Sequence, residues 1–247
     1  MRRIPGFVYL AAGVTALVVL APIVNWIYQA ARKPSELLYP VSDEWFKTPA
    51  ETWRTYGDLF VANSTAIMTP DLLAALAQQE ASGNPVARTY WRWSATFRPF
   101  EIYRPASSAV GMYQVTDGTF EEARHYCIRD HRVVGEGPWY DFGSCWFNGL
   151  YNRVLPAHAV ELVAANLDRR VRETLARSGI RQATLRQKQE LAVITHLCGA
   201  GAAAAYAARG LVLVPGQHCG DHDTQHYVQR VMTLAKTFAA LDKGSSS

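Results

Sequence analysis

The sequence predicts an all-α, or nearly all-α, protein in which one N-terminal transmembrane helix precedes a helical domain. Three observations carry this prediction. Residues 7–28 are almost uninterruptedly apolar, apolar residues recur at helical spacing through the rest of the chain, and no convincing alternating segment of the strand type occurs. The apolar run leaves about 200 of the 247 residues, which is enough for one domain with a substantial core.

The N-terminal run is interrupted only by Pro22 and Asn25. A helix over these residues would be about 30 Å long, which matches the hydrocarbon core of a bilayer. A signal peptide cleaved near Ala30-Ala31 is the alternative, but signal peptides have a shorter apolar core. We therefore expect residues 1–28 to be a membrane anchor, and the weak bias of basic residues favours an N-terminus on the inner side.

Four cysteines suggest two local disulfides. Cys127 and Cys145 bracket a stretch rich in Pro, Gly and Trp, and Cys198 and Cys219 bracket another short segment. Pairing within each couple is the most economical of three connectivities, and each bridge would contribute roughly 3 kcal/mol. Four buried free thiols are the alternative, and an exported domain makes the disulfides the better interpretation.

The elements after the anchor follow in order. Residues 29–50 carry several prolines and are interpreted as a membrane-proximal linker. Thr69-Pro70-Asp71 predicts the start of a helix that ends near Gly83-Asn84-Pro85. Further helices are expected over residues 117–126, 157–177, 184–198 and 202–209, and from a cap at Asp223 to about residue 242. The domain would thus span residues 51–242, with a flexible tail over 243–247.

Glu80 stands at the end of an apolar helix. Leu72 and Leu76 precede it by eight and four residues, so the three side chains share one helix face. Partial desolvation of a carboxylate on such a face raises its pKa and keeps it protonated near neutral pH. A general acid for glycosidic cleavage needs such a proton. The plain alternative is a solvated glutamate at a helix end.

Four sequence blocks carry a resemblance to a known family. Residues 80–85 (Glu-Ala-Ser-Gly-Asn-Pro) resemble the Glu-Ser-x-x-Asn-Pro signature of the soluble lytic transglycosylases, relatives of goose-type lysozyme. Residues 108–116 resemble that family's Gly-Ala-x-Gly-Leu-Met-Gln block, residues 195–199 its Ala-Tyr-Asn-Ala-Gly motif, and residues 224–231 its closing Thr-x-x-Tyr-Val-x-x-Val motif. The blocks follow the family's order, and the resemblance implies a lysozyme-like helical domain.

The resemblance implies cleavage of peptidoglycan between N-acetylmuramic acid and N-acetylglucosamine. Glu80 would protonate the glycosidic oxygen and then act as base on the muramic C6 hydroxyl, which closes on C1 to give a 1,6-anhydro sugar. The second carboxylate of ordinary glycosidases is not needed, and neither a metal nor another cofactor is implied. The anchor would lie in a bacterial inner membrane with the domain in the periplasm. An enzyme anchored there would suit a secretion or division machinery that opens the wall locally.

The resemblance also implies positions in the substrate cleft. Gly111 would let the backbone pass close to the sugar, Gln114 would face the substrate, and Met112 and Tyr113 would line the cleft. The hydroxyl of Tyr227 would orient Glu80, with a role as a core aromatic as the alternative. The other cleft residues would be Ser82, Ser108 and His196.

Departures from the family pattern keep two alternatives open. Ala81 replaces a serine, which Ser82 could supply from one position later. His196 replaces a tyrosine and is either a donor in the cleft or a core histidine. A non-catalytic glycan-binding or secretion-scaffold protein on the same fold is therefore the first alternative. The second is a lysozyme-type hydrolase, which would need an activated water, with Asp117 or Glu121 as the candidate second carboxylate.

Two insertions also depart from the compact pattern. Residues 88–104 are rich in aromatic residues and arginines, which could stack on sugars and pair with carboxylates. The alternatives are a packed cap and a patch near bilayer headgroups. The second insertion, over residues 124–156, contains the first cysteine pair and is expected to be a lid beside the cleft.

Zinc and nucleic acid are two other possible ligands. A cluster of possible zinc ligands occurs late in the chain; its members are His218, Cys219, Asp221, His222, Asp223 and His226. Asp223 is better used as a helix cap, and Cys219 already has an expected partner, so we predict no metal. The net charge of +4 is scattered along the chain, which does not predict nucleic-acid binding.

Overall fold

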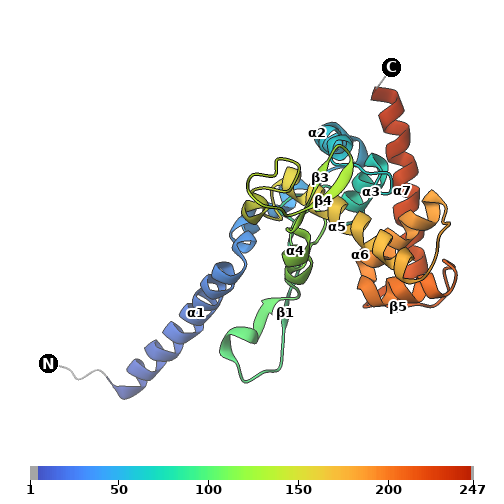
Figure 1. Cartoon of the computed structure of the whole chain (residues 1–247). Coiled ribbons are helices and arrows are strands. Elements are labelled where there is room, and N and C mark those ends of the chain that lie inside the picture. Colours follow the sequence, from blue (N-terminus) through green and yellow to red (C-terminus); the bar gives the residue numbers. More distant parts are fainter. Residues whose placement is uncertain (1–4, 246–247) are drawn as a thin grey trace.

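The computed structural model describes residues 5–245 and is mostly helical, as the sequence predicts (Figure 1). The longer helices are α1 (Gly6–Arg32), α2 (Pro49–Ala62), α3 (Pro70–Ala81), α5 (Pro156–Arg177), α6 (Leu185–Ala208) and α7 (Thr224–Ser245), with a short α4 (Asp117–Ala123). Helix α1 extends away from a body formed by the others (Figure 1).

Helix α1 exposes its apolar side chains and is long and apolar enough to cross a membrane. A signal sequence would meet the same criterion. Helix α6 meets it as well, but many of its side chains belong to the domain core. Helix α6 is therefore a core helix, and α1 is the candidate anchor.

The segment 29–50, which is interpreted from the sequence as a linker, is helical over most of its length. Helix α1 continues to Arg32, a 3₁₀ helix η1 follows over Pro34–Trp45, and α2 begins at Pro49. A proline in the first turn loses no hydrogen bond and already has a helical φ. Two of the prolines therefore start helices, and the Thr48–Glu51 capping box reinforces the second start.

Helix α3 is the centre of the body. It packs against α7 on one side and α2 on the other, while α5 packs against α6. The six consecutive residues from Leu72 to Ala77 are all fully buried. Burial of each leucine contributes about 1.5–3 kcal/mol, so the core holds the C-terminal end of α3, and with it Glu80, in a fixed position.

Three short antiparallel hairpins accompany the helices, so the fold is nearly all-α rather than all-α. Strand β1 (Trp91–Trp93) pairs with β2 (Tyr103–Pro105), β3 (Tyr126–Arg129) with β4 (Arg132–Gly135), and β5 (His218–Cys219) with β6 (His222–Asp223). Strands of two to four residues are too short to show alternation. Helix α4 therefore ends at Ala123, earlier than expected, because the chain turns into β3. Single 3₁₀ turns, η2 (Pro99–Glu101) and η3 (Asn148–Leu150), complete the two insertions.

Both predicted disulfides are confirmed. Cys127 and Cys145 bridge β3 to the loop after β4, and Cys198 and Cys219 bridge α6 to β5, with Cα–Cα distances of 5.7 and 5.4 Å. The two helices expected around Gly199 join across a kink at that residue, whose φ is 77°. The bridge therefore ties this kink to the turn before α7.

The last helix is longer than expected. The Asp223 carboxylate accepts a hydrogen bond from the His226 backbone N–H at 2.7 Å, as predicted for its cap. Helix α7 then continues to Ser245. Residues 243–245 of the expected tail are thus helical, and residues 246–247 lie outside the described residues.

Candidate functional site

The Glu80 carboxylate lies where α3, α6 and α7 meet. The Tyr227 hydroxyl donates a hydrogen bond to Glu80 Oε1. His196 Nε2 lies 3.6 Å from the same oxygen, and the Glu80 and His196 side chains are 17% and 11% exposed. Glu80 is therefore a mostly buried carboxylate that meets a phenol and an imidazole while a small part of it reaches solvent.

Three elements bring these groups together. The buried face of α3 positions Glu80 in its last turn, and the close packing of α3 on α7 brings Tyr227 opposite it. His196 comes from α6 just before the kink at Gly199, in the stretch that the Cys198–Cys219 bridge holds to β5. The predicted contact between Tyr227 and Glu80 is present, and His196 faces the carboxylate.

The protonation state of Glu80 differs from the expectation. Burial raises the pKa of Glu80, but the contact and charge of His196, the hydrogen bond from Tyr227 and the charge of His222 together outweigh it, and the pKa lies below the usual range. The histidine charges act only when the imidazoles are protonated. The lowered pKa does not support the proton expected on Glu80 near neutral pH, because the sequence does not show which polar groups surround a buried carboxylate.

Tyr227 remains a neutral phenol at any ordinary pH. Burial raises its pKa far above the usual value, and the neighbouring Glu80 charge raises it further. The hydroxyl is therefore a permanent donor toward the carboxylate. A donor that cannot lose its proton orients one carboxylate oxygen and stabilises the ionised form.

A cavity of about 400 Å³ adjoins this cluster. His196 and Gln114 both line it, and α5 contributes Asn166 and Arg170 to its wall. The Gln114 side-chain amide donates to the Ala87 and Gly111 carbonyls at 3.2 and 2.9 Å, which fixes its orientation. His196 therefore links the carboxylate to a cavity with a mixed polar and apolar lining.

Met112 and Tyr113 are core residues rather than cleft residues. Both are fully buried, and the Tyr113 hydroxyl donates to the Leu73 carbonyl of α3 at 3.1 Å. Their expected contact with substrate is therefore wrong. The chain turns at Gly111 and directs the next two side chains into the core, which the linear motif does not reveal.

Gly111 and Ser108 both support the local backbone, and their predicted contacts with a sugar stay predictions. A Cβ on Gly111 would lie 2.2 Å from the Arg153 carbonyl oxygen, and its φ of 80° favours glycine. The Ser108 hydroxyl accepts a hydrogen bond from the Asp117 N–H at 3.1 Å, at the start of α4. The close approach predicted for Gly111 exists, but the neighbour is the chain itself.

Ser82 ends α3 in a left-handed conformation with a φ of 48°. Its carbonyl accepts a hydrogen bond from the Lys47 N–H at 2.8 Å, which ties the end of α3 to the start of α2. Ser82 therefore stabilises the backbone at the end of α3. Its predicted contact with substrate stays a prediction.

His222 is the residue that the sequence placed in a different site. Its ring lies 6.0 Å from the Tyr227 ring, and its charge lowers the pKa of Glu80. The zinc alternative grouped His222 with Cys219, which is in a disulfide, and Asp223, which caps α7. The sequence signal for a place beside Glu80 and Tyr227 was the position of His222 just before the helix that carries Tyr227.

The two carboxylates considered for a hydrolase are engaged elsewhere. Asp117 pairs with Arg153 at 2.8 Å, and Glu121 pairs with Arg124 at 3.4 Å. No protein-family model, curated protein or solved structure matches the chain. The assignment of a function therefore depends on the geometry around Glu80 and on the sequence blocks that supply it.

Proposed function

We propose that this chain is a peptidoglycan lytic transglycosylase with a lysozyme-like helical domain and Glu80 as its single acid/base. The convergence of the four motif blocks carries the proposal. Glu80, His196 and Tyr227 come from three of them and form one cluster, and Gln114 from the fourth lines the cavity that His196 also lines. Segments more than a hundred residues apart thus supply one polar site at the end of a buried helix.

The lowered pKa of free Glu80 shapes the mechanism. Burial already acts on this carboxyl more strongly than any other single influence, and it favours the neutral form. A sugar that covers the exposed part of Glu80 excludes water and strengthens that influence. Glu80 in the covered site then carries the proton that a general acid requires.

The reaction conserves atoms without water or a cofactor. Glu80 gives its proton to the glycosidic oxygen as the bond to the muramic C1 breaks. The C6 hydroxyl then attacks C1, its proton returns to Glu80, and a 1,6-anhydro ring forms. During the ionised interval, the Tyr227 hydroxyl stabilises the carboxylate by its hydrogen bond.

The cavity beside His196 is the proposed sugar site. Its volume of about 400 Å³ falls in the range of small-ligand pockets, which is about 300–1,000 Å³. Gln114, Asn166 and Arg170 line this cavity, in which the sugar and its acetamido substituent would lie. The acetamido group of the substrate itself would offset the positive charge that develops at C1.

The anchor and the disulfides support a periplasmic location at a bacterial inner membrane. Helix α1 is long and apolar enough to span the bilayer, and disulfides persist in oxidising compartments. An enzyme held there acts on the wall layer closest to the membrane. Such placement suits a secretion or division machinery that needs a local opening.

Release of soluble fragments from purified sacculi tests the proposal. The full chain in detergent micelles should solubilise sacculi, and Glu80→Gln should reduce the rate by about 10²–10⁴-fold, the usual contribution of a general acid/base. Asp58→Asn, at an exposed carboxylate of α2, is the matched control and should act as the native chain. Sacculi that stay intact but bind the native chain tightly would refute the proposed enzyme activity and support the glycan-binding alternative. The lowered pKa of Glu80 in the free site favours that alternative.

A further inference from the structure

The β1–β2 hairpin lies against the end of α1. Both project from the same side of the body (Figure 1). The Asn25 side chain donates to the Tyr103 carbonyl at 2.7 Å, and the Gln29 side chain donates to the Phe100 carbonyl at 2.5 Å. The Tyr28 ring stacks on Phe100 with centroids 4.5 Å apart. The hairpin therefore lies beside the last two turns of α1.

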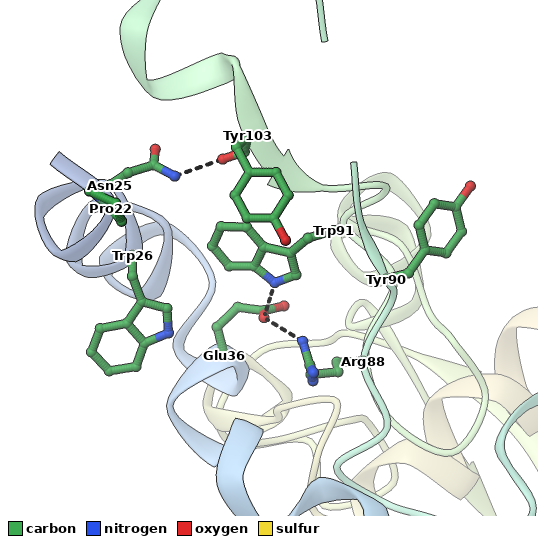
Figure 2. Close-up of a pocket in the computed structure, with 8 residues that line it drawn as sticks. All are labelled: Pro22, Asn25, Trp26, Glu36, Arg88, Tyr90, Trp91 and Tyr103. Carbon is green, nitrogen blue, oxygen red and sulfur yellow. Dashed lines mark hydrogen bonds and ion pairs between the residues drawn. The ribbon is translucent and has the colours of Figure 1, made fainter. Parts of the chain in front are cut away.

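The base of the hairpin is fixed to the chain that leaves α1. The Glu36 carboxylate of η1 is buried, accepts a hydrogen bond from Trp91 Nε1 at 2.9 Å and pairs with Arg88 and Lys33 at 3.7 and 3.3 Å (Figure 2). An apolar cavity of about 370 Å³ lies between the two elements. Its wall includes Pro22 and Trp26 of α1 and the aromatic side chains Tyr90, Trp91 and Tyr103 (Figure 2).

The position of this contact along α1 sets its depth in a bilayer. The apolar surface begins at Phe7, and a helix that crosses a core of about 30 Å uses about 20 residues. The hairpin lies against residues 22–29, which occupy the end of such a span. It is thus held at the boundary between acyl chains and headgroups.

The hairpin exposes aromatic side chains at this level. Trp93 is 75% exposed and Phe97 is fully exposed, while Tyr90 and Tyr103 are exposed beside them. Trp93 and Tyr103 stack with centroids 4.6 Å apart, which stiffens the pair. Exposed aromatic clusters are unusual on soluble surfaces, whereas tryptophan and tyrosine are enriched at membrane interfaces.

Basic side chains accompany these aromatics. Arg92 and Arg98 are exposed on the hairpin. A second cavity, of about 170 Å³, is lined in part by Arg32, Arg104 and Ser107. Arg104 Nε is buried and has no hydrogen-bond partner within residues 5–245, and guanidinium groups bind phosphate well.

We infer that the β1–β2 hairpin is a docking surface for the headgroup layer of an anionic phospholipid bilayer, the one that α1 crosses. The inference rests on α1 being a membrane span. The aromatic side chains of the hairpin enter the boundary between headgroups and acyl chains, and Arg92 and Arg104 contact lipid phosphates. The contacts with α1 favour lipid over a glycan, because they hold the hairpin at the membrane level. Two attachments then fix the orientation of the domain above the bilayer.

Fluorine NMR of the full chain tests this surface. The chain is labelled with 5-fluorotryptophan and placed in nanodiscs that contain phosphatidylglycerol, and tryptophan-to-phenylalanine variants assign the signals. A gadolinium chelate on lipid headgroups should broaden Trp93 strongly, and a water-soluble chelate should broaden it weakly. Trp139, which is 83% exposed in the loop after β4, is the matched control and should respond at least several-fold more to the soluble chelate than Trp93 does.

Three outcomes would overturn the inference, and they are distinguishable. If Trp26 responds to the lipid-bound chelate and Trp93 does not, the anchor stands and the hairpin assignment fails. If neither responds, α1 does not cross the bilayer. If soluble glycan fragments shift the Trp93 signal and lipid does not, the hairpin is a sugar site. Loss of sacculus cleavage in Glu80→Gln concerns the proposed function alone.

The phosphate contacts need a separate variant. Arg92→Gln combined with Arg104→Gln should reduce the lipid-induced broadening of Trp93 several-fold and leave that of Trp26 unchanged. Nanodiscs of phosphatidylcholine alone should have the same effect on the native chain. Broadening of Trp93 that is unchanged in both cases would refute the role of anionic phosphate.

Discussion

The hydrogen bond from Tyr227 to Glu80 makes a sharp prediction about stability. Tyr227→Phe keeps the aromatic ring in the core and removes only the hydroxyl that donates to the carboxylate. Tyr227 is 5% exposed, so water does not replace the lost donor well. A hydrogen bond to a charged group contributes about 1.5–3 kcal/mol. We expect the variant to lose about 2 kcal/mol of unfolding free energy at neutral pH, a roughly 30-fold change in the unfolding equilibrium.

The loss should depend on pH in a defined direction. The pKa of folded Glu80 is lowered, so this carboxylate stabilises the fold above the ordinary glutamate pKa. That contribution disappears as the pH falls through the lowered value. The difference between the native chain and Tyr227→Phe should therefore be largest at neutral pH and shrink in acid.

Urea unfolding in detergent micelles, followed by circular dichroism from pH 7 to pH 3, measures this difference. Tyr113→Phe is the matched control, because its hydroxyl donates to the neutral Leu73 carbonyl. It should lose about 1 kcal/mol, with no dependence on pH. In a double-mutant cycle, Tyr227→Phe should cost less unfolding free energy in the Glu80→Gln background than in the native chain, since a neutral acceptor binds more weakly. A Tyr227→Phe loss under about 0.5 kcal/mol, or one that does not change with pH, would refute the reasoning.

Three further predictions concern His196, Gly111 and the Cys127–Cys145 disulfide. In His196→Gln, the titration of the site carboxyl, followed by NMR of carbon-13-labelled glutamate, should move to higher pH, because the removed contact and charge lower its pKa and burial raises it; an unchanged midpoint would contradict this. Gly111→Ala should lose about 3 kcal/mol or more of unfolding free energy, given its positive φ and the backbone 2.2 Å from the new Cβ. Gly118→Ala, which meets nothing within 4 Å, is the control, and equal losses in the two variants would be inconsistent with the packing. Joint replacement of Cys127 and Cys145 by serine should lower stability by about 3 kcal/mol, or roughly 10 °C in melting temperature, by calorimetry; an unchanged melting temperature would show that the bridge does not restrain the unfolded chain.

Much of the framework follows from local sequence signals. The cap and proline at Thr69–Pro70 predict the start of α3, and its leucines at helical spacing predict the buried face that ends in Glu80. The motif order also predicts that Tyr227, 147 residues away, contacts that carboxylate. Such features are predictable because each depends on a short pattern or a specific motif.

Most of the features that sequence reasoning missed depend on tertiary surroundings. The proline-rich segment after α1 is helical because prolines can start helices as well as break them. Met112 and Tyr113 lie in the core because a turn at Gly111 redirects the chain. The lowered pKa of Glu80 needs the positions of two histidines in space. The last two features cannot be read from neighbours along the chain, whereas the helix starts at Pro34 and Pro49 are local signals that the interpretation as a linker overlooked.

Mass spectrometry of the sugar ends after sacculus digestion tests the central claim most directly. The account predicts muropeptides whose muramic residues lack one water, as 1,6-anhydro ends do, and predicts that Glu80→Gln removes them. Products with ordinary reducing ends would show a hydrolase in place of a transglycosylase. Anhydro products that persist in Glu80→Gln at the native rate would contradict the assignment of Glu80 as the acid/base.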